Sequence, residues 1–210
     1  MSGAFFAARY VWDNLIAEAD DPLPPELEEI NADFAKPRFK GEILGVFIAP
    51  PDEPVPDKYT TFAEYCGSEQ ATSEQMAWDA AGQFALAINL PSQFKLETDS
   101  LNTGVVGCGG KVYAARWSYA VAQPSGYQGT LVIARGVFSH FPFDVSTERV
   151  KTIEAGGRPA VLVEPITPDG IGSNAAVIFP ETFGVTEIQS SGIPLTQLLE
   201  VAERVGEVTK

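Results

Sequence analysis

The clearest pattern in the chain is the apolar periodicity of its last segment. Leucine, alanine and valine recur every three or four residues between Pro194 and Val205, and charged residues fall mostly between them. This spacing predicts an amphipathic helix, with Gly206 suited to its C-terminal end. Because so short a helix is marginal alone in water, we expect its apolar face, including Leu198 and Leu199, to pack against a sheet.

Two apolar runs before this helix predict the strands of that sheet. Residues Ala160–Val163 and Ala175–Phe179 are rich in β-branched and aromatic side chains, and turn residues lie at their boundaries. Gly156-Gly157 predicts a hairpin turn, since glycine adopts positive φ without strain. We expect the helix, with Leu198 and Leu199, to be buried against the sheet that carries Val161, Val163, Val177 and Phe179.

The middle of the chain also has a β pattern, over Phe94–Leu96, Lys111–Val121 and Thr130–Val137. Side chains of Lys111–Val121 alternate between two faces. One face carries Val112, Ala114, Arg116 and Ser118, and the other carries Tyr113, Ala115, Trp117 and Tyr119. Since the second face holds the aromatic residues, we predict that it is the packed side.

The N-terminal half is patterned for helices. We predict helices over Phe5–Ala19, over Glu26–Phe34 and from Thr72 or Ser73 to Ile88, and a buried strand over Gly41–Ala49. The four prolines between Pro50 and Lys58 predict an extended loop. The expected fold is α+β: a largely antiparallel sheet with a C-terminal helix packed on one face, plus a helical N-terminal part. The expected domains are 1–49, a proline-rich loop at 50–58, and 59–210.

Composition narrows the classes of partner. The chain has 210 residues, 45% of them hydrophobic, and a formal net charge of −14. A negative surface without a basic cluster argues against nucleic acid and anionic lipid. No apolar stretch is long enough to span a bilayer, and no secretory signal begins the chain. We therefore expect a cytoplasmic protein if the chain is full length, and an extracytoplasmic one if an upstream anchor was removed. The apolar N-terminal helix could serve as an oligomer contact.

Candidate catalytic residues are few. Ser139, His140 and Asp144 are the residue types of a hydrolytic triad, but a triad is a geometry, and no nucleophile-elbow motif accompanies them. We expect His140 to be a packing residue among aromatic neighbours. Glu164, Asp169 and Glu181 could form an acid/base pair or a hard-cation site, although their spacing matches no calcium loop.

No cofactor or metal is predicted. The glycine-rich stretch Gly104–Gly110 has the spacing of neither a dinucleotide fingerprint nor a phosphate loop. Cys66 and Cys108 are the only cysteines, and with one histidine they cannot complete a four-ligand zinc site. They could form a disulfide, or they could be two unrelated small apolar residues.

From Leu90 to Val205 the chain resembles a known family. The order is an LPSQF opening, a strand meander, GGRPAVLVEP, AVIFPE, and the closing GIPLTQLLEVAERV. It is similar to a bacterial domain of unknown function found at the extracytoplasmic C-termini of some anti-sigma factors and lipoprotein-like proteins. The resemblance implies a sensor role and supplies no catalytic residues.

Three functions follow from these observations. The first is a non-catalytic binding or sensory module for a protein or small ligand. The second is a hydrolase-like enzyme that uses carboxylates or His140 in a cleft. The third is a structural or assembly protein. The absence of a catalytic motif favours the first.

Overall fold

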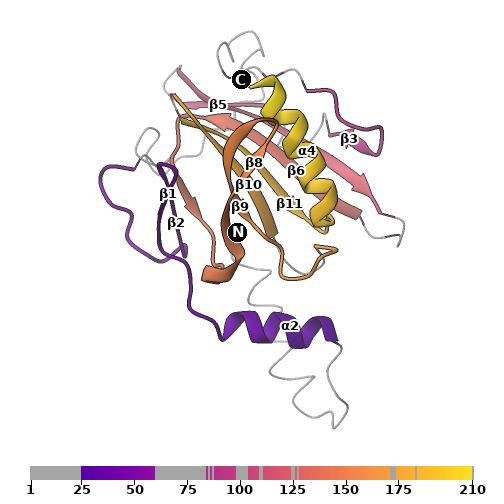
Figure 1. The fold of residues 1–210 in the computed structure, drawn as a ribbon. Coiled ribbons are helices and arrows are strands. Elements are labelled where there is room, and N and C mark those ends of the chain that lie inside the picture. The colour runs from indigo at the N-terminus through magenta and orange to yellow at the C-terminus, as the bar shows by residue number, and fades with distance from the viewer. Residues whose placement is uncertain are drawn as a thin grey trace.

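The computed structural model describes residues 25–59, 84, 86, 88–97, 104–108, 111–123, 126, 128–170, 174–182 and 184–209. One eight-stranded sheet dominates it. The strands are β3 (Phe94–Leu96), β4 (Gly104–Cys108), β5 (Lys111–Ala122), β6 (Gln128–Gly136), β8 (Val150–Ala155), β9 (Arg158–Val163), β10 (Asn174–Glu181) and β11 (Gly184–Ser191). Their order is β3-β5-β6-β11-β10-β9-β8, and β4 pairs with β5 on the same edge as β3 (Figure 1). The pairings in this sheet are antiparallel, which confirms the predicted sheet type.

The predicted glycine hairpin joins β8 to β9. Gly156 and Gly157 both have positive φ, at 57° and 71°, as a two-residue turn with the twist of the strands requires. A Cβ at Gly156 would lie 2.4 Å from the backbone nitrogen of Glu207. The glycine therefore both forms the turn and lets the C-terminal helix approach it.

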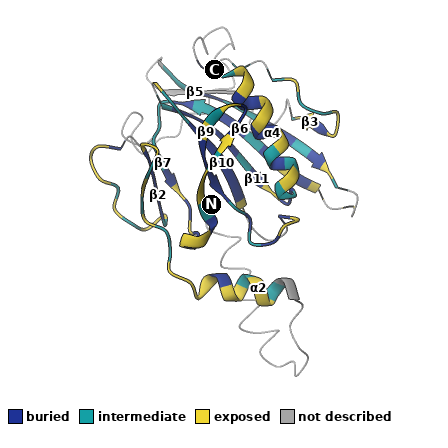
Figure 2. Ribbon diagram, in the orientation of Figure 1, coloured by how far each residue is buried: buried dark blue, intermediate teal, exposed yellow. Residues whose placement is uncertain are grey.

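The C-terminal helix α4 (Leu195–Val208) packs on one face of the large sheet, as predicted. Leu198 is fully buried, and Leu199 is partly buried against the same core. Val177 and Phe179 belong to this core, but Val161 and Val163 belong to the core on the opposite face. Both faces of β9 are covered, so its sequence shows no apolar–polar alternation from which a face could be assigned. Figure 2 shows the buried strands beneath α4.

A smaller sheet, the apolar layer, covers part of the other face. It consists of β1 (Gly41–Ile43), β2 (Val46–Ala49) and β7 (His140–Pro142), with β2 parallel to β7. Its core residues Val46, Ile48 and Phe141 pack with Val161, Val163, Ala176, Ile178 and Val185 of the large sheet. The large sheet is thus enclosed between α4 and this layer over β9 and β10.

The predicted single strand Gly41–Ala49 is a hairpin instead. Leu44 and Gly45 have positive φ, at 51° and 80°, and they turn the chain between β1 and β2. Gly45 is a typical turn residue, but the residue before it is Leu44. Left-handed turn positions favour Asn, Asp or Gly, so the pair Leu44-Gly45 did not predict a turn.

The N-terminal part was predicted to be helical, and the described residues do not support this. They contain one helix there, α2 (Pro25–Phe34), followed by β1 and β2. The expected helices at Phe5–Ala19 and from Thr72 to Ile88 lie outside the described residues, apart from a few isolated positions near the second. The domain division stays a prediction, and β2, on the N-terminal side of the proline-rich segment, packs on the large sheet.

Candidate functional site

His140 lies on the outer side of the apolar layer. Its ring is 6.0 Å from that of Phe47, tilted by 33°, and Phe47 stacks in turn on Tyr59. Burial lowers the pKa of His140, so the ring is neutral near pH 7. Its Nε2 is buried and has no hydrogen-bond partner among the described residues.

Asp144 and Ser139, the other candidate triad residues, make contacts in other directions. The Asp144 carboxylate is 40% exposed and pairs with Arg38, with 3.1 Å between Nε and Oδ1. The backbone carbonyl of Ser139 accepts the N–H of Phe47 and so joins β2 to the β7 segment. The contacts of these residues build the apolar layer, and the catalytic alternative gains no support from them.

The three candidate carboxylates are kept apart by the sheet. Glu164 follows β9 and pairs with Lys151, whereas Glu181 ends β10 and pairs with Arg135, each at 2.5 Å. Because Val163 pairs with Ala176, Glu164 is level with Ala175, and six residues of β10, about 20 Å, separate it from Glu181 at the opposite end of the strand. Asp169 accepts a hydrogen bond from Thr167 within its own turn. Within the described ranges, no group of three His, Cys, Asp or Glu side chains could hold a metal ion.

The cysteine pair is not tested. Cys66 lies outside the described residues, and for Cys108 the structure describes the backbone of β4 but not the side chain. The disulfide stays a prediction.

A buried ion network connects α2 to the large sheet. Asp33 accepts hydrogen bonds from Ser146 at 2.5 Å, Arg38 at 3.1 Å and Arg149 at 3.2 Å. Arg149 also donates to the carbonyl oxygens of Glu164 and Asn174. Burial would raise the pKa of Asp33, but these hydrogen bonds and the charge of Arg149 outweigh burial and lower it. With its donors and acceptors matched, the network has a structural role.

A second group of polar side chains lies on the large sheet beside the apolar layer. We call this surface the polar face. It consists of Arg116 and Ser118 on β5 and Glu187 and Gln189 on β11, with the apolar residues Val132 and Ala134 of β6 between them. Arg116 and Glu187 are both register partners of Ala134, from opposite sides. With strands about 4.8 Å apart, their Cα atoms lie about 10 Å apart, and only an alanine methyl group rises between them.

Glu187 is a buried carboxyl group without an ion pair. The residue is 6% exposed, and its carboxyl oxygen accepts a hydrogen bond of 2.7 Å from the side chain of Gln189. Burial raises the pKa of Glu187 to about 7, against the lowering effects of this hydrogen bond and of the Arg116 charge. The group can therefore hold or release a proton near neutral pH, as groups at functional sites often do.

Arg116 has an unused donor. Its Nε is buried and has no hydrogen-bond partner among the described residues. A guanidinium keeps its charge at every ordinary pH, so an unpaired buried N–H costs free energy that neutralisation cannot recover. Arg116 thus keeps one buried N–H donor for which the described residues supply no acceptor.

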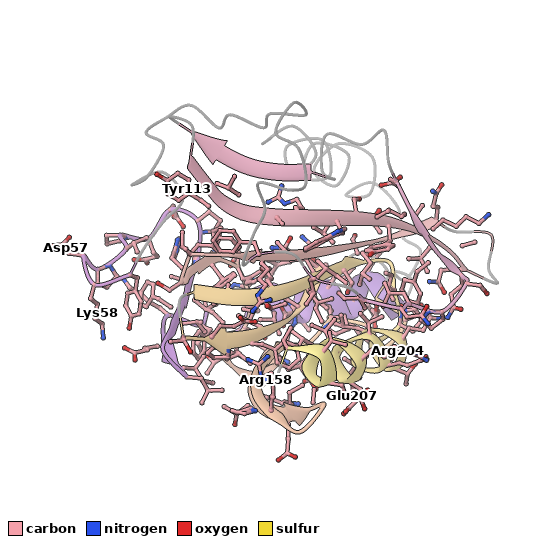
Figure 3. The ribbon with its side chains drawn as sticks, turned by 90° about the horizontal axis from the view of Figure 1, so that it is seen from above. Asp57, Lys58, Tyr113, Arg158, Arg204 and Glu207 are labelled. Atoms are coloured by element: carbon pink, nitrogen blue, oxygen red, sulfur yellow. The ribbon has the colours of Figure 1, made fainter. Side chains whose placement is uncertain are left out.

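The arginines on the α4 side of the sheet show the contrast. Arg135 donates twice to Glu181, through Nε at 3.0 Å and Nη2 at 2.5 Å. Arg158 donates to the carbonyl oxygens of Thr209 at the end of α4 and Pro180 of β10. Figure 3 shows Arg158 beside α4, near Glu207. These arginines hold the fold together, whereas the Nε of Arg116 has no hydrogen-bond partner among the described residues.

Exposure changes along the polar face and shows where it can be reached. Thr130 and Ser191, which are register partners at one end, are exposed. The next pair, Val132 and Gln189, is partly buried, and the pair Ala134–Glu187 is buried. The buried end is closed by Gly136, where a Cβ would lie 2.5 Å from the Phe138 ring. A molecule would therefore reach Glu187 from the Thr130 end.

The sequence analysis did not select this site. Its signals were a charged residue in the interior of each of two strands, Arg116 in YAARWSYAV and Glu187 in VTEIQ. The analysis did place Arg116 on the face opposite the aromatic residues, and Tyr119 indeed lies in the α4-side core. What it lacked was the strand order, because β5 and β11 meet the same residue of β6 only through a non-local pairing.

Comparison of the chain with family models, with curated proteins and with solved structures finds no match in any of the three. The resemblance to an extracytoplasmic sensor domain therefore stays a prediction. In the part of the chain that the structure describes, no helix combines the length and apolar character needed to cross a membrane.

Proposed function

We propose that this chain is a non-catalytic binding module whose polar face receives a small polar ligand. The observation that carries the proposal is the pair formed by Arg116 and Glu187. A buried guanidinium donor without a partner faces the same surface as a buried carboxyl group without an ion pair, across one alanine. Buried polar groups are normally matched, so an unmatched guanidinium N–H on the same face as a carboxyl group without an ion pair favours a site completed by a ligand.

Small residues near these groups support a ligand site. Ala114 and Ser118 flank Arg116 on its face of β5, and Ala134 is its register partner on β6, so its neighbours on these two strands are small. A purely structural sheet face would carry branched apolar residues, as the neighbouring half of the face does with Val161, Val163 and Ile178. The sensory role that the resemblance implies requires such a ligand site.

The hydrolytic alternative has less support. Glu187 could act as an acid or base, but the hydroxyl on the same face, that of Ser118, donates to Glu97 at 2.8 Å. The single histidine of the chain, His140, lies on the smaller sheet against Phe47. A nucleophile activated by a neighbouring base is therefore not assembled by the described contacts of this face.

The test is a thermal-unfolding screen of the full chain against panels of small anions, cations, neutral polar molecules and short peptides. A ligand at a hundred times its Kd stabilises the native state by about 2.7 kcal/mol, which raises Tm by several degrees in a domain of this size. We expect at least one panel to raise the Tm of the wild type. The same ligand should raise the Tm of R204Q, which changes an exposed arginine of α4, but not that of R116Q.

Two results would contradict the proposal. One is that none of the four panels changes the Tm of the wild type. The other is that every stabilising ligand acts on R116Q as strongly as on the wild type, which would place its site elsewhere.

A further inference from the structure

We propose that the polar face binds the carboxylate of a small, singly charged ligand between the guanidinium of Arg116 and the carboxyl group of Glu187. This inference rests on the proposed function, because it names the chemical class that the same surface receives. Its basis is the charge balance of the two groups and the geometry of the donor that Arg116 leaves unused.

The charge balance favours an anion. Arg116 cannot lose its charge, whereas Glu187 can become neutral by taking up a proton. The pair without a ligand is therefore most stable as a cation beside a neutral acid, with one positive charge in excess. A cationic ligand would have to ionise Glu187 while lying near Arg116, so it is disfavoured twice.

The geometry favours a carboxylate. The guanidinium presents planar, parallel N–H donors, which match the two oxygens of a carboxylate. A protonated Glu187, about 10 Å away in Cα position, offers an O–H to the ligand from the other side of Ala134. The ligand would be held by charge-assisted N–H donation from one strand and by O–H donation from another.

A dianion such as phosphate fits less well. Ser118, two residues from Arg116 on the same face of β5, donates a hydrogen bond to the carboxylate of Glu97. A second negative charge on the ligand would be repelled by this carboxylate. No second basic side chain belongs to the polar face as defined. A single arginine therefore balances a single negative charge.

The net charge of −14 does not prevent this binding. Charges more than about 10 Å away are screened at ordinary ionic strength, while the contact with Arg116 is direct and partly buried. The access end is lined by the neutral residues Thr130, Val132 and Gln189. The organic part of the ligand would therefore contact both polar and apolar side chains there.

The experiment uses acetate as probe and observes the arginine Nε–Hε resonances of the full chain by nuclear magnetic resonance. The Arg116 signal is identified as the one missing from R116K. We expect acetate to shift it saturably with a Kd of about 1 mM, as suits so small a ligand, and the neutral isostere acetamide to leave it unchanged.

Variants separate the two contacts. With the arginine fork lost, R116K should bind acetate at least about tenfold more weakly, as followed by the backbone amide of Ala134, whereas R204Q should bind as the wild type does. In the wild type the affinity should fall about tenfold between pH 6 and pH 8, because ionised Glu187 repels the ligand. Among the described residues, the groups that act on the pKa of Glu187 are Gln189, through its hydrogen bond, and Arg116, through its charge, while Glu97 lies three strands away at the β3 edge. E187Q keeps a donor and should lose this pH dependence.

Other outcomes distinguish this inference from the proposed function. If inorganic phosphate or methylammonium shifts the Arg116 signal and acetate does not, the carboxylate inference is wrong and the binding face stands. If acetate, acetamide, phosphate and methylammonium all leave the signal unchanged, the carboxylate inference is wrong, and the proposed function is wrong as well if the four panels of the unfolding screen also leave Tm unchanged. Equal acetate binding by wild type and R116K would also overturn the inference.

Discussion

The two halves of one sheet face differ in what they bury. Over β9 and β10 the face carries Val161, Val163 and Ile178, and the apolar layer covers it. Over β5, β6 and β11 it carries Arg116, Glu187 and Gln189. Ile178 and Glu187 are register partners on adjacent strands, so the change of character occurs within one pair of residues.

This difference indicates which half serves stability and which serves another purpose. Burying an apolar side chain stabilises the fold, whereas burying a carboxyl group that lacks an ion pair costs free energy. A hydrophobic residue at position 187 would continue the apolar half and make the protein more stable. The proposed ligand site would explain the glutamate there, which folding stability does not.

The largest expected effect on stability concerns the buried ion network, which joins α2 to Arg149 beside the apolar half of the face. Asp33→Ala should lower the free energy of unfolding by about 3–5 kcal/mol, because Arg149 is left buried without its carboxylate partner. Chemical denaturation measures this. Asp52→Ala, at an exposed aspartate, should change the free energy by less than about 0.5 kcal/mol. Equal effects of the two substitutions would show that α2 is not held by Asp33.

The next prediction compares the cores on the two faces. Ile178→Ala beneath the apolar layer and Leu198→Ala beneath α4 should each cost about 2–5 kcal/mol, through lost transfer free energy and the cavity left behind. Denaturant midpoints measure both. A small effect of one substitution alone would mean that its covering layer is not docked on the sheet.

The control for Leu198 must be chosen with care. Glu203, which the sequence placed on the outer side of the helix, accepts the backbone N–H of Gly156 at 2.6 Å and so supports the hairpin. Thr196 is exposed and is the better control. Thr196→Ala should change the stability by less than about 0.5 kcal/mol.

The polar half should show itself in the pH dependence of stability. Burial raises the pKa of Glu187 from 4.5 to about 7, so between these values the folded protein holds a proton that the unfolded chain has released. Stability from this group is complete below pH 4.5 and falls as the pH rises to about 7, by about 3 kcal/mol in all.

Glu187→Gln isolates this contribution. Other groups also make stability depend on pH. Asp33, for example, has a lowered pKa and makes stability fall at acid pH. Subtracting the stability curve of the variant from that of the wild type cancels such contributions and leaves that of Glu187. At pH 8 the variant should be the more stable of the two. A difference that stays constant from pH 4 to pH 8 would show that Glu187 titrates normally.

The sequence was sufficient where the pattern is local. The periodicity around Leu198 predicted α4, and Gly156-Gly157 predicted the β8–β9 hairpin, because a helix face and a two-residue turn are set by nearby residues. The face on which Val161 lies could not be assigned from the sequence, since a strand buried on both sides carries no apolar–polar alternation.

The candidate site was beyond the sequence for a different reason. Arg116 and Glu187 are far apart in the chain and become neighbours of Ala134 only when β11 pairs with β6. Strand order in a sheet is set by the summed packing of both faces, and no residue near Arg116 or Glu187 encodes it. The charges inside apolar strands were visible, but their common face was not.

The smallest expected effect concerns the hairpin that carries the apolar layer. Leu44 has φ 51° and is 41% exposed, so it adopts a left-handed conformation without gaining burial in return. That conformation costs a leucine about 1–2 kcal/mol, and asparagine tolerates it better because its short side chain hydrogen-bonds locally. Leu44→Asn should therefore stabilise the protein by about 0.5–1 kcal/mol, measured by denaturant midpoint.

Leu96→Asn makes the same chemical change at an exposed position of β3 that has no positive φ, and it should give no gain. If both substitutions raise the midpoint equally, the benefit comes from removing an exposed leucine and not from the turn. If Leu44→Asn lowers the midpoint, contacts of Leu44 with the apolar layer outweigh its backbone strain. The packing of this layer would then include the turn of the β1–β2 hairpin.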